Sequence, residues 1–402
     1  MTRRRAFGKF SPGEPLPLRG FEKYFRIKAR EGPEAWRSSY TSVQMLLDHL
    51  SRFSGSDGSR QSYLNMLKKF CQQNSYDPDK LITLSKGEVG RLIQNYADET
   101  AKKNASKSYV NTIIKRLRTF FHVNGFEDLK LQVYYQPTRY RKRPEYIPTK
   151  GEVHAMANAA GSIRDRAIIL SLWSCGLRVS TLCALNHGDL SDELDSEERF
   201  LRVQVFPGMK ERVPDACKGE VPYYSFLCAE AGEALRVYLR EREEQYGEIG
   251  ADDPLFHSDW NLWERDERSR KRLGRRGVGL LVKKAARLAG LGEWEHVTPH
   301  CLRKAFDSVL RSPCVDGSRL DKGTQEFLFG HILPGSQDVY YDRTKVDFHR
   351  NEYSKLDFSV GGVSGRGRDK LIDIGELVRH FEEGWLFVSR VGDGKAVVRR
   401  GV

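Results

Sequence analysis

Four short segments of the chain carry side chains whose types could bind and attack an anionic group. They contain Arg178, then His300 and Arg303, then Gly330 and His331, and last Tyr340 and Tyr341. Guanidinium groups bind oxyanions through paired hydrogen bonds, imidazoles exchange protons near neutral pH, and a phenol can act as a nucleophile. Taken singly, each segment has an ordinary alternative: a surface arginine, a helix-end histidine or a pair of packing tyrosines. The order and spacing of the four segments are more specific than any one segment alone.

In this order and at these separations the segments resemble the tyrosine recombinase, or phage-type integrase, family. The pattern is Arg178, then His300-x-x-Arg303 on one helical face, then Gly330-His331 with Tyr340 nine residues after the histidine. The resemblance covers both halves of the chain. The loop style is most similar to integrases of archaea and their viruses or plasmids. The resemblance implies a site-specific DNA recombinase that uses no metal ion, organic cofactor or ATP.

The resemblance also implies a role for each side chain. Arg178 and Arg303 would bind the non-bridging phosphate oxygens, because the planar guanidinium fork matches them better than an ammonium group does. Tyr340 would attack phosphorus and form a 3′-phosphotyrosyl bond, which conserves the bond energy for rejoining. His300 would take the tyrosine proton or bind the phosphate. His331 would donate a hydrogen bond to a non-bridging oxygen.

Two assignments stay open at this point. The leaving 5′ oxygen needs a proton, which the family takes from a lysine in the turn between two strands. Lys210 and Lys218 both lie in such a loop, and the spacing to the second strand favours Lys218. The nine-residue step from the histidine favours Tyr340 as the nucleophile over its neighbour Tyr341.

The elements that must position these side chains form two expected domains. Residues 21–134 show apolar positions at three- and four-residue steps and almost no strand pattern, which predicts a helical core-binding domain that contacts DNA. Ser85, with Glu88 three residues on, and Ser106 are typical helix N-caps. We expect residues 1–20 to form a basic N-terminal arm.

The second domain is expected to be mainly helical with a small antiparallel sheet, an α+β fold. A basic, proline-containing linker over 135–150 would precede a catalytic domain over 151–358. Residues 200–206 and 221–227 carry strand signals and are expected to pair as a small antiparallel element. A cap at Thr149 would begin the first of two helices that end near residue 175.

Further helices are expected along the rest of the chain. Their predicted ranges are 231–246, 278–289, 300–311 and 324–329. The tail over 359–402 is predicted to hold a helix at 371–381 and a hairpin of 385–391 with 395–399 around Gly392 and Gly394. We expect this tail to latch onto a partner.

The charge balance agrees with a polyanionic partner. The 402 residues include 67 Lys and Arg against 54 Asp and Glu, a net charge of +13. Clustered basic residues would hold the DNA backbone and make binding steeply dependent on salt. The DNA-binding candidates are Lys107, Lys115, Arg116, Arg139, Arg141, Lys142, Arg143, Arg270, Lys271 and Arg272.

Other classes of protein fit the sequence poorly. No apolar run approaches the length of a membrane span, and no apolar stretch follows the basic start as in a secretory signal. The seven cysteines are odd in number and contain no Cys-x-x-Cys pair, which favours a reducing cytoplasm and argues against a zinc module.

The resemblance implies partners and leaves the biological role open. The expected partners are double-stranded recombination sites and further copies of the chain, in a tetramer assembled on DNA. The expected location is the cytoplasm of a prokaryote, at its nucleoid. Alternatives are a dimer-resolving recombinase of the same chemistry and an inactive DNA-binding relative.

Overall fold

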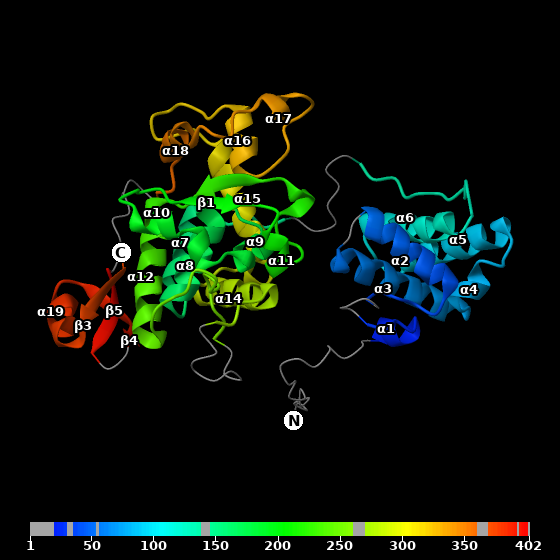
Figure 1. Ribbon diagram of the computed structural model, residues 1–402, viewed down its shortest axis with the longest axis horizontal. Helices are drawn as coiled ribbons and strands as arrows, with labels where there is room; N and C mark the ends of the chain where they lie inside the picture. Colours follow the sequence, from blue (N-terminus) through cyan, green and yellow to red (C-terminus); the bar gives the residue numbers. More distant parts are fainter. Residues whose placement is uncertain are drawn as a thin grey trace. The chain divides into compact units, whose positions relative to one another are not determined.

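The computed structural model describes residues 20–29, 35–53, 56–137, 145–259, 270–359, 369–391 and 394–400. The chain divides into two compact units, Met1–Pro144 and Glu145–Val402, each with its own core (Figure 1). Both units are mainly helical, and the second also contains small antiparallel sheets, which confirms the predicted fold class. Every helix within these residues is too short or too polar to cross a bilayer.

The first unit is a helical bundle in which α6 packs against α2, α3 and α5. Its helices are α1 (Gly20–Tyr24), α2 (Thr41–Phe53), α3 (Asp57–Asn74), α4 (Pro78–Leu81), α5 (Lys86–Lys102) and α6 (Lys107–Val123). Phe70, Phe120 and Phe121 are buried where these helices meet, and Phe70 and Phe121 lie edge to face. The apolar stripe of α6 therefore forms the centre of the bundle.

Side-chain caps set where several of these helices begin. Ser85 and Glu88 form the predicted capping box, each bonding the backbone N–H of the other. Ser106 accepts from the backbone N–H of Tyr109 at the start of α6. At the start of the second unit, Thr149 and Glu152 form a further capping box on α7. All three predicted caps are confirmed.

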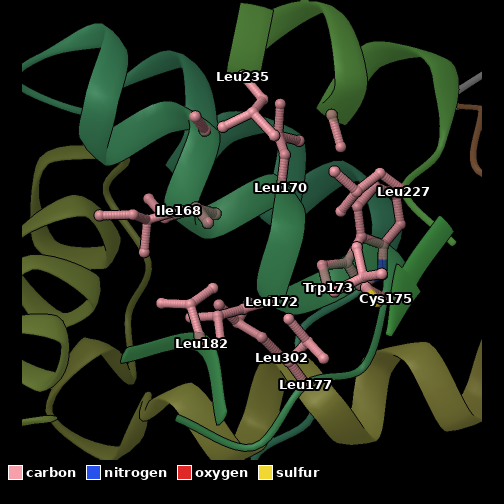
Figure 2. Packing of buried hydrophobic residues seen from close by; sticks show 14 of the residues in the cluster. Ile168, Leu170, Leu172, Trp173, Cys175, Leu177, Leu182, Leu227, Leu235 and Leu302 are labelled. Atoms are coloured by element: carbon pink, nitrogen blue, oxygen red, sulfur yellow. The ribbon is translucent and has the colours of Figure 1, made fainter. Parts of the chain in front are cut away.

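The second unit is built around one buried helix, α8. Its main helices are α7 (Lys150–Asn158), α8 (Ile163–Ser174), α12 (Ala229–Tyr246), α14 (Arg275–Leu288) and α15 (Pro299–Arg311). Helix α8 contacts each of the other four. Figure 2 shows Ile168, Leu170 and Trp173 of α8 packed among Leu235 of α12 and Leu302 of α15. Because α8 is buried on nearly every side, including at Arg164 and Arg166, it fixes the relative positions of the helices that surround it.

Shorter elements complete the part of this unit that precedes residue 360. They are α9 (Val179–Ala184), α10 (Ser191–Asp195), β1 (Arg202–Val205), α11 (Met209–Arg212), β2 (Tyr223–Phe226), α16 (Lys322–Leu328), α17 (Gln337–Tyr340) and α18 (Val346–Ser354), with 3-10 turns η1 (His187–Asp189), η2 (Lys218–Glu220) and η3 (Trp294–His296). Strands β1 and β2 pair antiparallel, with Val205 opposite Tyr223, which confirms the predicted strand pair. Helix α16 packs against β2.

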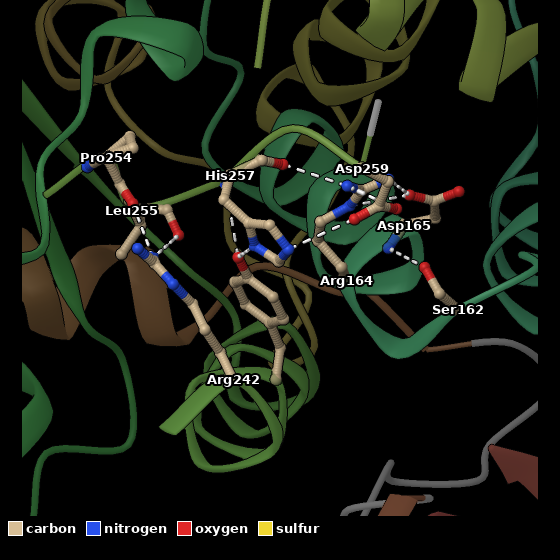
Figure 3. Close-up of polar contacts among 9 residues, drawn as sticks. Ser162, Arg164, Asp165, Arg242, Pro254, Leu255, His257 and Asp259 are labelled. Carbon is tan, nitrogen blue, oxygen red and sulfur yellow. Dashed lines mark hydrogen bonds and ion pairs between the residues drawn. The ribbon is translucent and has the colours of Figure 1, made fainter. Parts of the chain in front are cut away.

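Buried polar contacts hold the segment that leads up to residue 259. Arg242 donates to the carbonyl of Pro254 at 2.7 Å, and Arg164 pairs with Asp259 at 2.6 Å (Figure 3). His257 lies between them, with Nδ1 2.7 Å from the hydroxyl of Tyr238. Burial is the main cause of its lowered pKa. These contacts satisfy polar groups that would otherwise destabilise the core.

The C-terminal tail adds a second sheet that packs on helix α12. Strands β3 (Asp369–Asp373), β4 (Trp385–Val391) and β5 (Lys395–Arg400) have the order β3-β5-β4, all antiparallel, beside α19 (Leu377–Glu382) and η4 (Ile374–Glu376). Strand β3 contacts α12, as Figure 1 shows, and Lys395 pairs with Glu244 of that helix. Val397 is part of the main core.

The predicted helix over 371–381 is wrong in its first part. Leu371 and Ile372 lie in β3, opposite Val397 and Ala396 of β5, and α19 begins only at Leu377. Pairing with the apolar strand β5 outweighs the local helical pattern, as happens for short segments whose strand partner lies elsewhere in the sequence. The predicted hairpin of β4 and β5 is confirmed.

Candidate active site

Arg303 joins three of the four segments singled out in the sequence. It lies in α15 and is only 3% exposed. Its guanidinium group donates to the carbonyl of Gly176, just before Arg178, and to the carbonyl of Phe329 at 2.5 Å, just before His331. It also stacks 3.8 Å from the centre of the Phe329 ring. One side chain therefore brings together loops that are more than a hundred residues apart in the sequence.

Two glycines allow these loops to approach so closely. Gly176 has a φ of 59° and Gly330 a φ of 69°, a backbone region that other residues adopt at a cost. A Cβ atom at Gly176 would overlap the ring of Phe306, and one at Gly330 would overlap the ring of Tyr223. Glycine is required at both positions by its backbone and by its missing side chain.

Arg178 is the second guanidinium group of the site and is free to bind a ligand. It is half-buried at the N-cap of α9, and its side chain makes no hydrogen bond or ion pair to any described residue. Its charge contributes to the lowered pKa of Arg303, for which burial is the main cause. Two guanidinium groups within each other's field repel, and an anion between them would relieve that repulsion.

His300 occupies the first turn of α15, one turn before Arg303. Its pKa is lowered, chiefly by burial and then by the positive charges of Lys304 and Arg303, against an opposing effect of Glu145. Lys304 pairs with Glu145. The imidazole is therefore neutral at pH 7 and can accept a proton.

His331 is held by a carboxylate that sequence reasoning missed. Its Nδ1 lies 2.6 Å from Oε2 of Glu326, and its ring lies edge-on to Phe329. Glu326 also accepts from Arg311 at 3.0 Å. Burial would raise the pKa of Glu326, but the hydrogen bonds from His331 and Arg311 outweigh it and lower the pKa. The only sequence signal is an acidic residue five positions before the histidine, which local patterns do not single out.

The two neighbouring tyrosines lie in different environments. Tyr340 ends α17, is 82% exposed, and its side chain has no partner among the described residues. Tyr341 is half-buried, and its hydroxyl lies 2.9 Å from Nε2 of His349 and 3.1 Å from Oγ1 of Thr324. Burial raises the pKa of Tyr341. This difference favours Tyr340 as the nucleophile.

The two candidate lysines also differ. Lys210, in α11, pairs with Glu220 at 2.7 Å, with the glutamate well exposed. Lys218 is exposed in η2 and has no hydrogen bond or ion pair within the part of the chain that the structure describes. Cys217, Gly219 and Glu220 around it all have positive φ. The loop thus presents Lys218 freely, which favours it as the proton donor.

The predicted DNA-binding residues lie in different surroundings. Lys107, Lys115 and Arg270 are exposed, and Arg116 stacks over Tyr63 at 5.4 Å. The backbone of Lys271 accepts from Ser258 at 2.7 Å. Four further candidates lie outside the described residues: Arg139, Arg141, Lys142 and Arg143.

Arg272 stabilises the fold and is not available to bind DNA. Its guanidinium group donates to the carbonyls of Cys183 at 2.8 Å and Leu185 at 2.9 Å, and to the Asn186 side chain at 2.5 Å. Burial is the main cause of its lowered pKa. Because these donors are committed to protein acceptors, we remove Arg272 from the DNA-binding set.

No group of three or more His, Cys, Asp or Glu side chains that could hold a metal ion occurs among the described residues. The cysteines are all buried and unpaired. The site therefore consists of guanidinium, imidazole, phenol and ammonium groups. Such a set can bind an anion, accept a proton and supply an oxygen nucleophile.

Sequence comparison identifies relatives of this chain. The sequence model of the Phage integrase family matches residues 149–322. Tyrosine recombinase XerA of Thermococcus kodakarensis is 30% identical over 247 residues, covering 61% of this chain and 73% of that protein. Tyrosine recombinase XerC of Chromobacterium violaceum is 30% identical over 259 residues, covering 62% and 74%.

Among solved structures, the Tn1549 transposon integrase in complex with circular intermediate DNA shares the fold. The TM-score is 0.50 at 17% sequence identity, and the match covers 78% of this chain and 98% of that one. The likeness at this level of identity concerns the fold alone.

Proposed function

The chain belongs to the phage integrase family of tyrosine recombinases, and from this we propose that it is a site-specific recombinase that cleaves and rejoins duplex DNA. The observation that carries the proposal is the position of Arg303 between the backbones beside Arg178 and His331. Neither Arg178 nor Arg303 forms an ion pair with a carboxylate among the described residues. Guanidinium groups of this kind suit a phosphodiester, whose charge must be neutralised before attack.

In the proposed reaction the Tyr340 oxygen attacks phosphorus while the bond from phosphorus to the 5′ oxygen breaks. His300, neutral because of its lowered pKa, takes the phenolic proton. Lys218 gives a proton to the leaving 5′ oxygen, so the products are a 3′-phosphotyrosyl bond and a free 5′-hydroxyl. Attack by a second 5′-hydroxyl reverses these steps and joins the new strand.

The remaining groups stabilise the charge that develops on the phosphate. Arg178 and Arg303 donate to the non-bridging oxygens, and His331 donates from its Nε2. Glu326 supports this role, because its carboxylate binds Nδ1 of His331 and fixes the orientation of the ring. Since bond energy is conserved in the phosphotyrosyl link, the proposed reaction requires no ATP. The two arginines provide the charge stabilisation that a metal ion would otherwise give, so the proposed reaction requires no metal ion.

A nicked duplex that traps the covalent intermediate tests the proposal. Wild-type protein should form a covalent protein–DNA adduct, and Tyr340→Phe should form none while it still binds the same duplex. Adduct formation by Tyr340→Phe at the wild-type level would contradict the assignment. Full relaxation of supercoiled DNA by wild type in the presence of a chelator would support the metal-free chemistry.

We further propose double-stranded recombination sites and a tetramer of the chain as the working assembly, acting in the cytoplasm on prokaryotic or viral DNA. Integration is the leading role, and resolution of dimers is the alternative. Plasmids that carry two candidate sites, as direct repeats or on separate molecules, distinguish them. Preference for separate molecules indicates integration, and preference for direct repeats indicates resolution.

A further inference from the structure

A chain of hydrogen bonds that the proposed reaction does not use ends one residue from Tyr340. At its centre is His349 of α18, which is 1% exposed. Its Nδ1 lies 2.6 Å from the hydroxyl of Tyr224 in β2, and its Nε2 lies 2.9 Å from the hydroxyl of Tyr341. The Tyr224 hydroxyl donates to the carbonyl of Arg343 at 3.0 Å. The chain thus connects the segment after α17 to a strand and to a following helix.

Aromatic packing holds the same residues together. The rings of Tyr341 and His349 are stacked, with centroids 5.5 Å apart and planes 21° apart. Phe327 of α16 contacts both of them and also lies edge to face with Tyr224 at 4.9 Å. The cluster therefore has its own apolar support, and its polar atoms are largely removed from solvent.

Helix α17 has no such support of its own. It contains no buried residue, and Val339 and Tyr340 are 81% and 82% exposed. Near its start, the side chain of Asp338 accepts from the backbone of Leu333 at 3.1 Å and from Arg343 at 2.5 Å. A four-residue helix without buried side chains takes its position from the contacts at its ends.

We propose that Tyr341, His349 and Tyr224 form an anchor that positions Tyr340 for attack, so that of two adjacent tyrosines one reacts and the other holds the segment. The inference rests on the proposed function, since it concerns the reactivity of Tyr340. The three anchor residues are positioning residues and touch no reacting atom.

The direction of the hydrogen bonds is consistent along the chain. Because the proton of Tyr224 goes to the Arg343 carbonyl, its oxygen accepts from Nδ1–H of His349. The neutral ring then accepts at Nε2 from the hydroxyl of Tyr341. Burial is the main cause of the lowered pKa of His349, which favours this neutral form. The Tyr341 hydroxyl can therefore donate to Nε2 of His349, and Oγ1 of Thr324 is its second contact.

Removing one hydroxyl group tests the anchor. Tyr341→Phe keeps the stacked ring and loses the hydroxyl contacts to His349 and Thr324. The single-turnover rate of adduct formation should therefore fall by about 10- to 100-fold, since a shift near 1 Å costs that much. DNA binding should not change. Trypsin should cleave more quickly after Arg343 and Lys345, because the segment is less firmly held.

Matched variants separate positioning from stability. Tyr353→Phe removes another buried hydroxyl from the same helix α18, where it donates to the Ser174 carbonyl at 2.7 Å, and should leave the adduct rate unchanged. His349→Ala should slow the reaction as Tyr341→Phe does. His349→Gln should recover part of the rate, because an amide can also donate to one hydroxyl and accept from another.

The outcomes distinguish the anchor from the nucleophile assignment. If Tyr340→Phe forms no adduct while Tyr341→Phe and His349→Ala react at the wild-type rate, the anchor is overturned and the proposed function stands. Equal slowing by Tyr341→Phe and Tyr353→Phe would also overturn it, because both would then act through stability. If adduct formation is lost in Tyr341→Phe and kept in Tyr340→Phe, both assignments are wrong.

Discussion

Arg303 serves the fold and the proposed chemistry with the same guanidinium group. It donates to two backbone carbonyls and stacks on Phe329, which leaves its remaining donors for a phosphate. Arg178 differs from Arg303, because its side chain has no hydrogen-bond or ion-pair partner in the part of the chain that the structure describes. The two arginines should therefore respond differently to the same substitution.

We predict that Arg178→Lys and Arg303→Lys both lower the adduct rate, by about 10²- to 10³-fold, because an ammonium group loses the bidentate contact. Only Arg303→Lys should also destabilise the fold, by about 1–3 kcal/mol, because two buried carbonyls lose their donors. Single-turnover kinetics and urea unfolding measure the two effects. Equal stability of the two variants would contradict the structural role of Arg303.

The pH dependence of cleavage should report on His300. Its lowered pKa means that the adduct rate is lost only as the pH falls below about 6.5, the ordinary value for histidine. Lys304→Gln removes one cause of that lowering, so the acidic limb of the pH profile should move to higher pH. If the acidic limb of the pH profile lies at the same pH in Lys304→Gln as in wild type, His300 is not the titrating base.

At the scale of elements, the site depends on tight turns between helices. The turn after α16 brings Phe329 to Arg303, and Gly330 has a positive φ and lies against the Tyr223 ring. Gly335 also has a positive φ, 61°, but nothing lies within 4 Å of a Cβ atom built there. Substitutions at Gly330 and Gly335 therefore distinguish the free-energy cost of backbone strain from the cost of steric overlap.

Gly335→Ala should lower the free energy of unfolding by about 1 kcal/mol, through strain alone. Gly330→Ala should lower it by about 2–5 kcal/mol, because overlap with Tyr223 adds to the strain. Denaturant unfolding of both variants measures the difference. Equal losses would show that the turn can relax away from Tyr223.

Local sequence signals predicted the elements whose causes are local. The caps at Ser85, Ser106 and Thr149 depend on residues three positions apart, and all three formed. Strand β3 depends on pairing with β5, more than twenty residues later, and was predicted as helix. The roles of Glu326 and Arg272 were also not predicted. Their partners are determined by tertiary packing, which produces no periodic pattern in the sequence.

At the scale of the whole molecule, the basic residues behind the net charge of +13 have two different roles. Some of them stabilise the fold, and others are available to bind a partner. Arg272 is committed to carbonyl oxygens, whereas Lys107 and Lys115 are exposed on α6. Exposed cations release counterions from DNA when they contact phosphates, and buried ones do not. Only part of the basic excess is therefore available for binding.

Binding measured against salt concentration tests this division. Replacing Lys107 and Lys115 together by Gln should reduce the slope of log Kd against log salt by about 1–2, if each contacts one phosphate. Arg272→Gln should leave the slope unchanged and lower the melting temperature instead. A reduced slope in Arg272→Gln would return that residue to the DNA-binding set.

The central claim is that Tyr340 forms a covalent bond to DNA within a site of two arginines and two histidines. The most direct measurement digests the trapped adduct with protease and identifies the DNA-linked residue by mass spectrometry. The account predicts a 3′-phosphate on Tyr340 and an unmodified Tyr341 in the same peptide. A phosphate on Tyr341, on another residue, or at a 5′ end would contradict it.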